Sequence, residues 1–133
     1  MMDYIIHILP NMIQGLGVSA KIFLFTIVLS LPIGVLLAMV RISKVGLFRR
    51  LAAMYIYVMR GTPLMLQLMV VYFGPFYLFG MNIGKWRFPA IITGFALNYG
   101  AYFAEIYRSG IVSMDRGQYE AAKLLGYSKG QTF

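Results

Sequence analysis

The chain has 133 residues, of which 60% are hydrophobic and only 12% are charged. Soluble domains are roughly 45–50% apolar and about 25% charged, so this composition indicates a membrane protein. The net charge is +8 and there is no cysteine, which excludes disulfides, zinc–thiolate sites and thiol catalysis.

The length allows three or four membrane spans of roughly 20 residues each, with no room for a separate soluble domain. We therefore expect a single all-α integral membrane domain over 1–133. Residues 1–20 are broken by Pro10 and by several polar and glycine residues, which predicts an interfacial lead-in helix rather than a span. No cleaved signal peptide is expected, because the first 20 residues contain no Lys or Arg and no small-residue cleavage pattern follows an apolar run. His7 is the chain's single histidine, and a lone histidine at a membrane surface is far more often solvated than a ligand, so no metal site is expected.

The first predicted span covers 22–40, which contains 19 uncharged residues. Such a helix is about 28 Å long and matches a hydrocarbon core of about 30 Å. Four basic residues follow residue 40: Arg41, Lys44, Arg49 and Arg50. The positive-inside rule therefore places the C-terminal end of this span in the cytoplasm and its N-terminal end outside. Within the span, Ser30, Gly34 and Ala38 recur every four residues and form a stripe that would let another helix approach closely.

The second predicted span covers 60–80. Its uncharged part, 64–79, is short, so residues before Thr62 are expected to complete the crossing. Gly61-Thr62-Pro63 breaks the helix, because proline lacks a backbone donor and disfavours helical geometry in the residue before it. Residues 47–63 either lie along the inner interface or begin this span obliquely.

The third predicted span covers 88–107 and follows an outer loop in which Trp86 is an interfacial anchor. Ala96, Gly100 and Ala104 form a second small-residue stripe. With an external N-terminus and a cytoplasmic C-terminus, three basic residues lie outside (Lys21, Lys85 and Arg87) and nine inside (Arg41, Lys44, Arg49, Arg50, Arg60, Arg108, Arg116, Lys123 and Lys129). This ratio supports the orientation.

A few polar groups lie within or beside the spans. Gln67, Asn98 and Tyr99 either line a cavity or form hydrogen bonds between helices. Arg60 either reaches lipid headgroups or lies with Gly61, Thr62 and Pro63 along a translocation path, where a broken helix exposes backbone dipoles. Glu105 and Arg108 have the spacing of an ion pair on one helix face.

The end of the chain predicts two short helices joined by a bend. Asp115 followed by Gln118 has the pattern of a capping box and starts a helix. Gly126 falls where a left-handed residue would end that helix. Ser128 and Gln131 repeat the capping pattern and start another helix.

This terminal segment, with Glu120-Ala121-Ala122 followed by Gly126, resembles the EAA motif by which membrane subunits of ABC importers bind their cytoplasmic ATPases. The strings Arg60-Gly61-Thr62-Pro63 and Ala104-Glu105-Ile106-Tyr107-Arg108-Ser109-Gly110 resemble the polar amino-acid uptake branch of that family. The resemblance implies a coupling loop over 110–133 that contacts the ATPase through Gly117, Glu120, Ala121, Ala122 and Gly126. Permeases of this family continue into about two further spans, so the chain looks like a fragment, truncated within the motif, of a five-to-six-span permease.

The resemblance also implies partners and a location. We expect a bacterial inner-membrane permease subunit that works with an ABC ATPase, an extracytoplasmic substrate-binding protein, a second permease subunit, identical or related, and an amino-acid substrate. No phosphate-binding loop occurs in the sequence, so the chain is not expected to be an enzyme or to bind a cofactor, and ATP and Mg²⁺ would belong to the partner. Nucleic acid is not an expected partner. The alternative is a small structural or assembly protein of the membrane whose cytoplasmic tail binds another partner.

Overall fold

The computed structural model describes residues 2–132, with side chains from Ile8 onward. The side chain of His7 and the last residue of the terminal motif, Phe133, lie outside this range. The described residues contain no strand and form six helices: α1 (Met2–Ile42), α2 (Gly46–Gly61), α3 (Leu64–Phe79), α4 (Arg87–Ser113), α5 (Arg116–Leu124) and α6 (Lys129–Thr132). The predicted all-α fold is confirmed.

The first helix, α1, is continuous through the region that the sequence divided into a lead-in helix and a span. No break separates the expected lead-in helix from the expected span. Isolated glycines such as Gly15 and Gly17 each cost a helix only about 1 kcal/mol, which does not end it. The stretch Ile8–Ile42 is long and apolar enough to cross a membrane.

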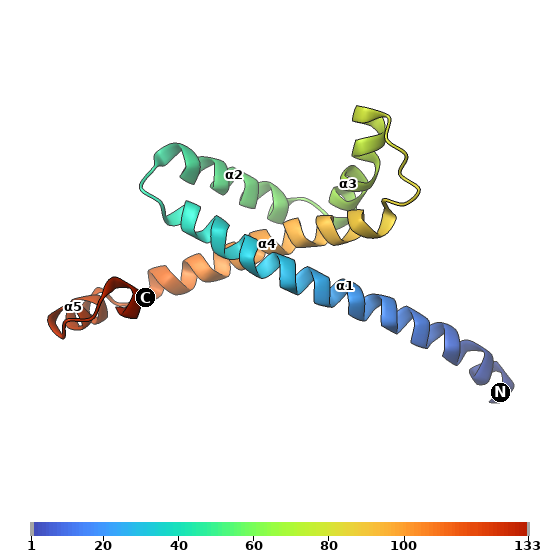
Figure 1. Ribbon diagram of the computed structural model, residues 1–133, viewed down its shortest axis with the longest axis horizontal. Coiled ribbons are helices and arrows are strands. Elements are labelled where there is room, and N and C mark those ends of the chain that lie inside the picture. Colours follow the sequence, from blue (N-terminus) through green and yellow to red (C-terminus); the bar gives the residue numbers. More distant parts are fainter. Residues whose placement is uncertain (1, 133) are drawn as a thin grey trace.

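The centre of the fold is a crossing of α1 and α4 (Figure 1). Contacts advance in the same direction along both helices: Phe25 meets the ring of Phe88, Ile33 lies against Gly100, and Arg41 lies near Glu105. The two helices therefore run parallel. If two parallel helices both span the membrane, the chain must pass back through the membrane between them. The segments that lie between α1 and α4 in the chain are α2 and α3.

Both small-residue stripes lie at this crossing, and the close helix approach that the sequence predicted for each of them is present. Ser30 and Ala104 are completely buried, and Ala38 and Ala96 nearly so. A Cβ on Gly34 would lie 2.6 Å from the Cβ of Phe103, which is closer than such atoms ever come. The backbones thus approach to a distance that only small residues permit.

The helix break expected at Gly61-Thr62-Pro63 is present, since α2 ends at Gly61 and α3 begins at Leu64. The axes of the two helices are bent by 109° across it. Only together, as this bent pair, are they long and apolar enough to cross a membrane. Both pack on α4, where Ile56, Ala101 and Ala104 form a small core.

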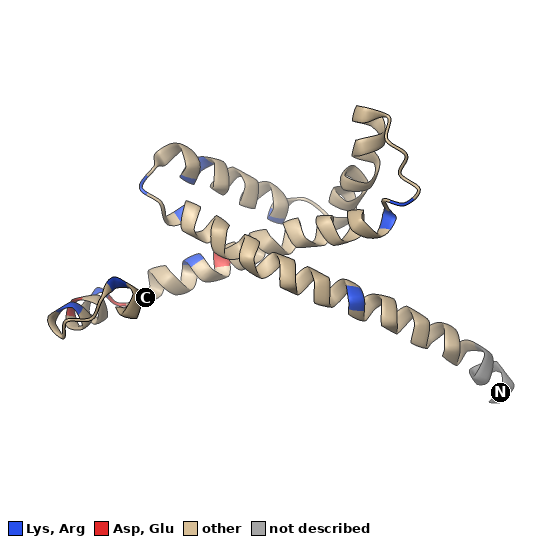
Figure 2. Cartoon of the chain, viewed as in Figure 1, with Lys and Arg blue, Asp and Glu red and all other residues tan. Residues whose placement is uncertain are grey.

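Residues 22–40 of α1, 64–79 of α3 and 88–104 of α4 carry no charge, and the charged residues of the chain lie outside these stretches (Figure 2). Many large apolar side chains along α1 and α3 are exposed, including Leu16, Phe23, Val70 and Leu78. Such wide apolar surfaces are far beyond what a soluble monomer exposes, and they suit contact with lipid.

Candidate functional site

The helix break between α2 and α3 leaves backbone acceptors that side chains satisfy. The carbonyl of Met59 would accept a hydrogen bond from residue 63 in a continuous helix, but Pro63 has no N–H. Instead, Gln67 Nε2 and Asn98 Nδ2 donate to that carbonyl oxygen, at 2.9 and 3.0 Å. The Thr62 hydroxyl donates to Val58 O at 2.8 Å. Side chains therefore satisfy the carbonyls of Val58 and Met59 at the break despite its proline.

The same side chains also bond to one another. Asn98 Nδ2 donates to Gln67 Oε1 at 2.8 Å, and Gln67 Nε2 donates to the Thr62 hydroxyl at 2.7 Å. Asn98 is only 5% exposed, so its amide needs these partners. Of the two roles left open by the sequence, this geometry favours hydrogen bonding between helices for Gln67 and Asn98.

Tyr99 lies apart from this network. Its ring stacks on Phe95 with a centroid distance of 6.0 Å and lines an apolar cavity of about 500 Å³ between α1 and α4. Consecutive residues of a helix point about 100° apart, so Asn98 and Tyr99 serve different surfaces. The structure therefore brings Gln67 and Asn98 together but places Tyr99 at a separate site.

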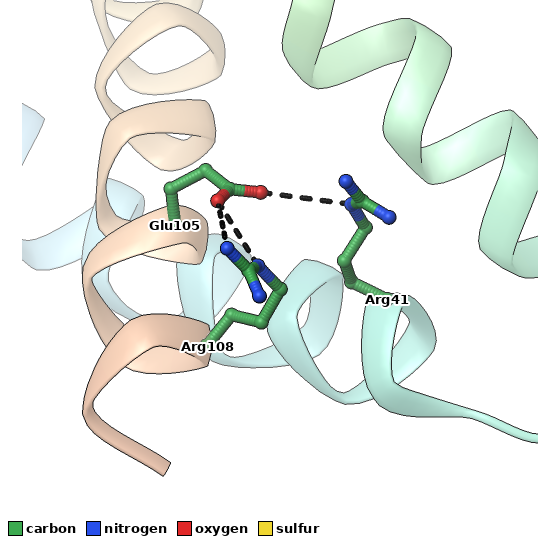
Figure 3. Close-up of polar contacts among 3 residues, drawn as sticks. All are labelled: Arg41, Glu105 and Arg108. Carbon is green, nitrogen blue, oxygen red and sulfur yellow. Dashed lines mark hydrogen bonds and ion pairs between the residues drawn. The ribbon is translucent and has the colours of Figure 1, made fainter. Parts of the chain in front are cut away.

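A second polar group gathers where α1, α2 and α4 meet. Glu105 Oε2 accepts hydrogen bonds from Arg108 Nη2 and Nε at 2.8 and 3.0 Å, which confirms the predicted pair. The other carboxylate oxygen, Oε1, lies 3.6 Å from Arg41 Nε (Figure 3). Sequence spacing could not reveal this contact, because Arg41 and Glu105 meet only through the helix crossing. The bond to Glu105 raises the pKa of Arg108, which lies beyond the predicted span 88–107.

Arg60 borders the same group from α2. Its guanidinium carbon lies 5.3 Å from the centroid of the Tyr102 ring, within cation–π range. Arg60, Arg41 and Glu105 line an open cavity of about 430 Å³. Among the residues described, Arg60 has no carboxylate within ion-pair distance. Arg60 thus belongs to this charged group, and its side chain takes no part in the network of the helix break.

The terminal segment has the predicted local structure. Asp115 caps α5 by accepting a hydrogen bond from the Gly117 N–H at 3.0 Å. Within the described range, the Gln118 side chain makes no return bond, so the first capping box is only half formed. The second is complete: Gln131 Oε1 accepts from Ser128 N, and Ser128 Oγ accepts from Gln131 N.

Gly126 ends α5 in the left-handed conformation, with φ of 80°. The N–H of Tyr127 donates to Ala122 O at 3.0 Å and that of Gly126 to Lys123 O at 3.1 Å, which is the Schellman arrangement. No residue of α5 is buried, and Gly117, Glu120 and Ala121 are exposed. The predicted coupling residues therefore form a locally defined surface that is largely exposed: Ala122 is half-buried, and the main contacts of α5 with another helix of the described chain are with α6.

Comparison with known proteins identifies the class. The family model described as "Binding-protein-dependent transport system inner membrane component" matches residues 30–133. The chain belongs to this family, and the predicted relationship to ABC permeases is confirmed.

Individual relatives carry amino-acid transport names. The arginine transport system permease protein ArtQ of Bacillus subtilis is 41% identical over 123 residues, covering 92% of this chain and 55% of ArtQ. A solved structure described as "Crystal structure of an amino acid ABC transporter with histidines" has a chain that is 36% identical, with a TM-score of 0.83, covering 97% of this chain and 59% of its own. These relatives are permease subunits rather than enzymes. The chain spans somewhat more than half the length of each.

Proposed function

We propose that this chain acts as a transmembrane permease subunit of an ATP-driven amino-acid importer. The observation that carries the proposal is the terminal segment: a capped helix, a left-handed glycine and a second capped helix, all unburied. Family membership supports a transport role. The name of ArtQ and the description of the matching crystal structure support amino acids as substrates.

The proposed orientation places the N-terminus outside and the C-terminus in the cytoplasm. Two observations support it. The basic residues at the end of α1, at the start of α2 and in α5 follow the positive-inside rule. The parallel course of α1 and α4 fits two crossings in the same direction, with the bent pair α2 and α3 as the return.

In the proposed mechanism, α5 docks on a cytoplasmic ATPase that binds ATP and Mg²⁺. Glu120 offers a carboxylate to a basic or N–H partner, while Ala121 and Ala122 allow close approach. Gly117 supplies the N–H that Asp115 caps, and Gly126 sets the direction of α6. Closure of the ATPase would pull on α5 and so tilt α4, to which only residues 114–115 connect it.

The translocation path is proposed to run beside the break between α2 and α3. Gly61, Thr62 and Pro63 interrupt the helix there, and Gln67 and Asn98 hold its free carbonyl. Arg60 lies at the cytoplasmic end of this path, whereas Tyr99 faces the apolar cavity between α1 and α4 and lies outside the path. A substrate-binding protein outside and a second permease subunit would complete the importer.

Paired glycine variants test the coupling role in the complete transporter. Gly126→Ala introduces a side chain at a left-handed position, which costs roughly 1–2 kcal/mol, whereas Gly130→Ala adds one in open space without that strain. We expect Gly126→Ala and the charge reversal Glu120→Lys to reduce both pull-down of the ATPase and amino-acid uptake. Gly130→Ala should leave both near the wild-type level. Equal association and uptake in all variants would refute the proposed coupling surface.

The orientation of the chain can be tested separately by thiol labelling. The chain contains no cysteine, so a single introduced cysteine is the one thiol available to a reagent. A single Tyr119→Cys substitution on exposed α5 gives a unique labelling site. A membrane-impermeant thiol reagent should label it only after the cells are opened. Labelling in intact cells would place α5 outside and overturn the proposal.

A further inference from the structure

We propose that Arg41 and Arg60 form a binding site for a phosphate group in the cavity between α1, α2 and α4. The inference goes beyond the transport role, since it concerns a ligand held at the edge of the membrane rather than a transported substrate. The cavity measures about 430 Å³ and opens to the surface, which leaves room for a phosphate and its ester substituent.

The position of the cavity is the first argument. Three predicted span ends meet there: Arg41 follows the span 22–40, Arg60 begins the span 60–80, and Arg108 follows the span 88–107. These residues are far apart in sequence, and the crossing of α1 and α4 brings them together. The ends of spans lie at the level of lipid phosphates, so the site is at the depth where a headgroup is available.

The charge balance is the second argument. Three guanidinium groups surround the single carboxylate of Glu105, which leaves a local charge of about +2. The hydrogen bonds to Glu105 come from Arg108. Arg41 Nε is buried and faces Glu105 Oε1 at 3.6 Å, but the Arg41 side chain is 31% exposed, and its Nη groups form no hydrogen bond among the described residues. Arg60 contacts the Tyr102 ring instead of an acid. Two arginines therefore keep donors for an anion.

The chemistry of those donors selects phosphate. A guanidinium presents its N–H groups in a planar, forked arrangement that matches phosphate oxygens. It is also more weakly hydrated than an ammonium group. Exposed apolar or aromatic side chains flank the cavity, with Tyr57 at 80% and Ile106 at 61% exposure, where acyl chains could lie. The phosphate could come from an anionic phospholipid or from free phosphate, and both share this recognition chemistry.

Native mass spectrometry of the complete, detergent-purified transporter tests the site with phosphatidylglycerol as the ligand. We expect Arg60→Gln to reduce the bound lipid about tenfold, since the variant loses a charge-assisted hydrogen bond to the phosphate that Arg49, outside the cavity, does not make. Arg49→Gln removes the same charge from an exposed position of α2 outside the cavity and should change binding less than twofold. Glu105→Gln should increase binding, because it removes the competing carboxylate.

A second arm separates the two sources of phosphate. Inorganic phosphate is titrated against the thermal stability of the same variants in lipid-free detergent. Selective loss of phosphatidylglycerol in Arg60→Gln assigns the site to a headgroup, whereas loss only of the stabilisation by inorganic phosphate assigns it to the free anion. If Arg60→Gln and Arg49→Gln match in both arms, or if Arg60→Gln binds as wild type does, the site is refuted. Arg60 is exposed and makes one ring contact, so its variant should fold.

Discussion

The crossing of α1 and α4 and the terminal segment of α5 and α6 are built in opposite ways. At the crossing, small residues are buried almost completely and the two backbones determine each other's position. In the terminal segment no residue is buried, yet the helix caps and the glycine bend are formed. The first region depends on tertiary packing and the second on local hydrogen bonds.

This difference separates two requirements of the proposed importer. A transmembrane pair must keep its geometry while force is applied, and close packing of small residues supplies this. A docking helix must present its surface to another protein, so it needs a defined shape without burial in its own chain. The polar residues divide similarly: Gln67 and Asn98 bond within the fold, while Glu120 is left exposed.

The largest effect is expected from a methyl group at the crossing. Gly34→Ala would bring its Cβ 2.6 Å from Phe103 Cβ and 3.3 Å from Ala104 N, so the helices must separate. Overpacking of this kind costs roughly 1–3 kcal/mol. The measurement is the free energy of unfolding of the purified permease in a denaturing detergent titration. Gly17→Ala, on the same helix with no atom within 4 Å, should be neutral or slightly stabilising. If both variants unfold alike, the close approach of α1 to α4 is incorrect.

A smaller loss is expected at the helix break. Asn98→Leu keeps the size of the side chain but removes the donor to Met59 O and Gln67 Oε1. Hydrogen bonds between membrane helices contribute about 1 kcal/mol, so the same titration should show a loss of about that size. Tyr99→Phe removes a hydroxyl from the neighbouring residue, whose face of α4 lies outside the network, and should cost less. A greater loss for Tyr99→Phe would contradict the assigned network.

The smallest effect on global stability is expected in the terminal segment. Asp115→Ala removes the cap of α5, which stabilises a helix start by about 1 kcal/mol. Because α5 buries nothing, amide hydrogen exchange should accelerate about fivefold in residues 116–124 while the unfolding transition of the whole protein stays unchanged. Asp115→Asn preserves a capping oxygen and should exchange like the wild type. A fall in global stability for Asp115→Ala would show that α5 packs on the rest of the chain.

The sequence by itself determined the features that depend on neighbouring residues and on solvent. Composition established the membrane class, and the pattern of Asp115, Ser128 and Gly126 predicted the terminal helices, because caps and left-handed glycines act within one turn. The small-residue stripes predicted a face for close helix packing on α1 and on α4, although not that the two faces would meet each other. The Glu105–Arg108 pair followed from their spacing on one helix.

The tertiary structure decided what depends on distant segments. It joined the lead-in region and the first span into one helix, and it bent α2 against α3 by 109°. It also showed that Asn98 supplies the donor that Pro63 lacks, and that Arg41 and Arg60 converge beside Glu105. Spacing along a chain fixes the direction of side chains around one helix. The relative placement of two helices follows from how their surfaces pack, and that information is not carried by either helix alone.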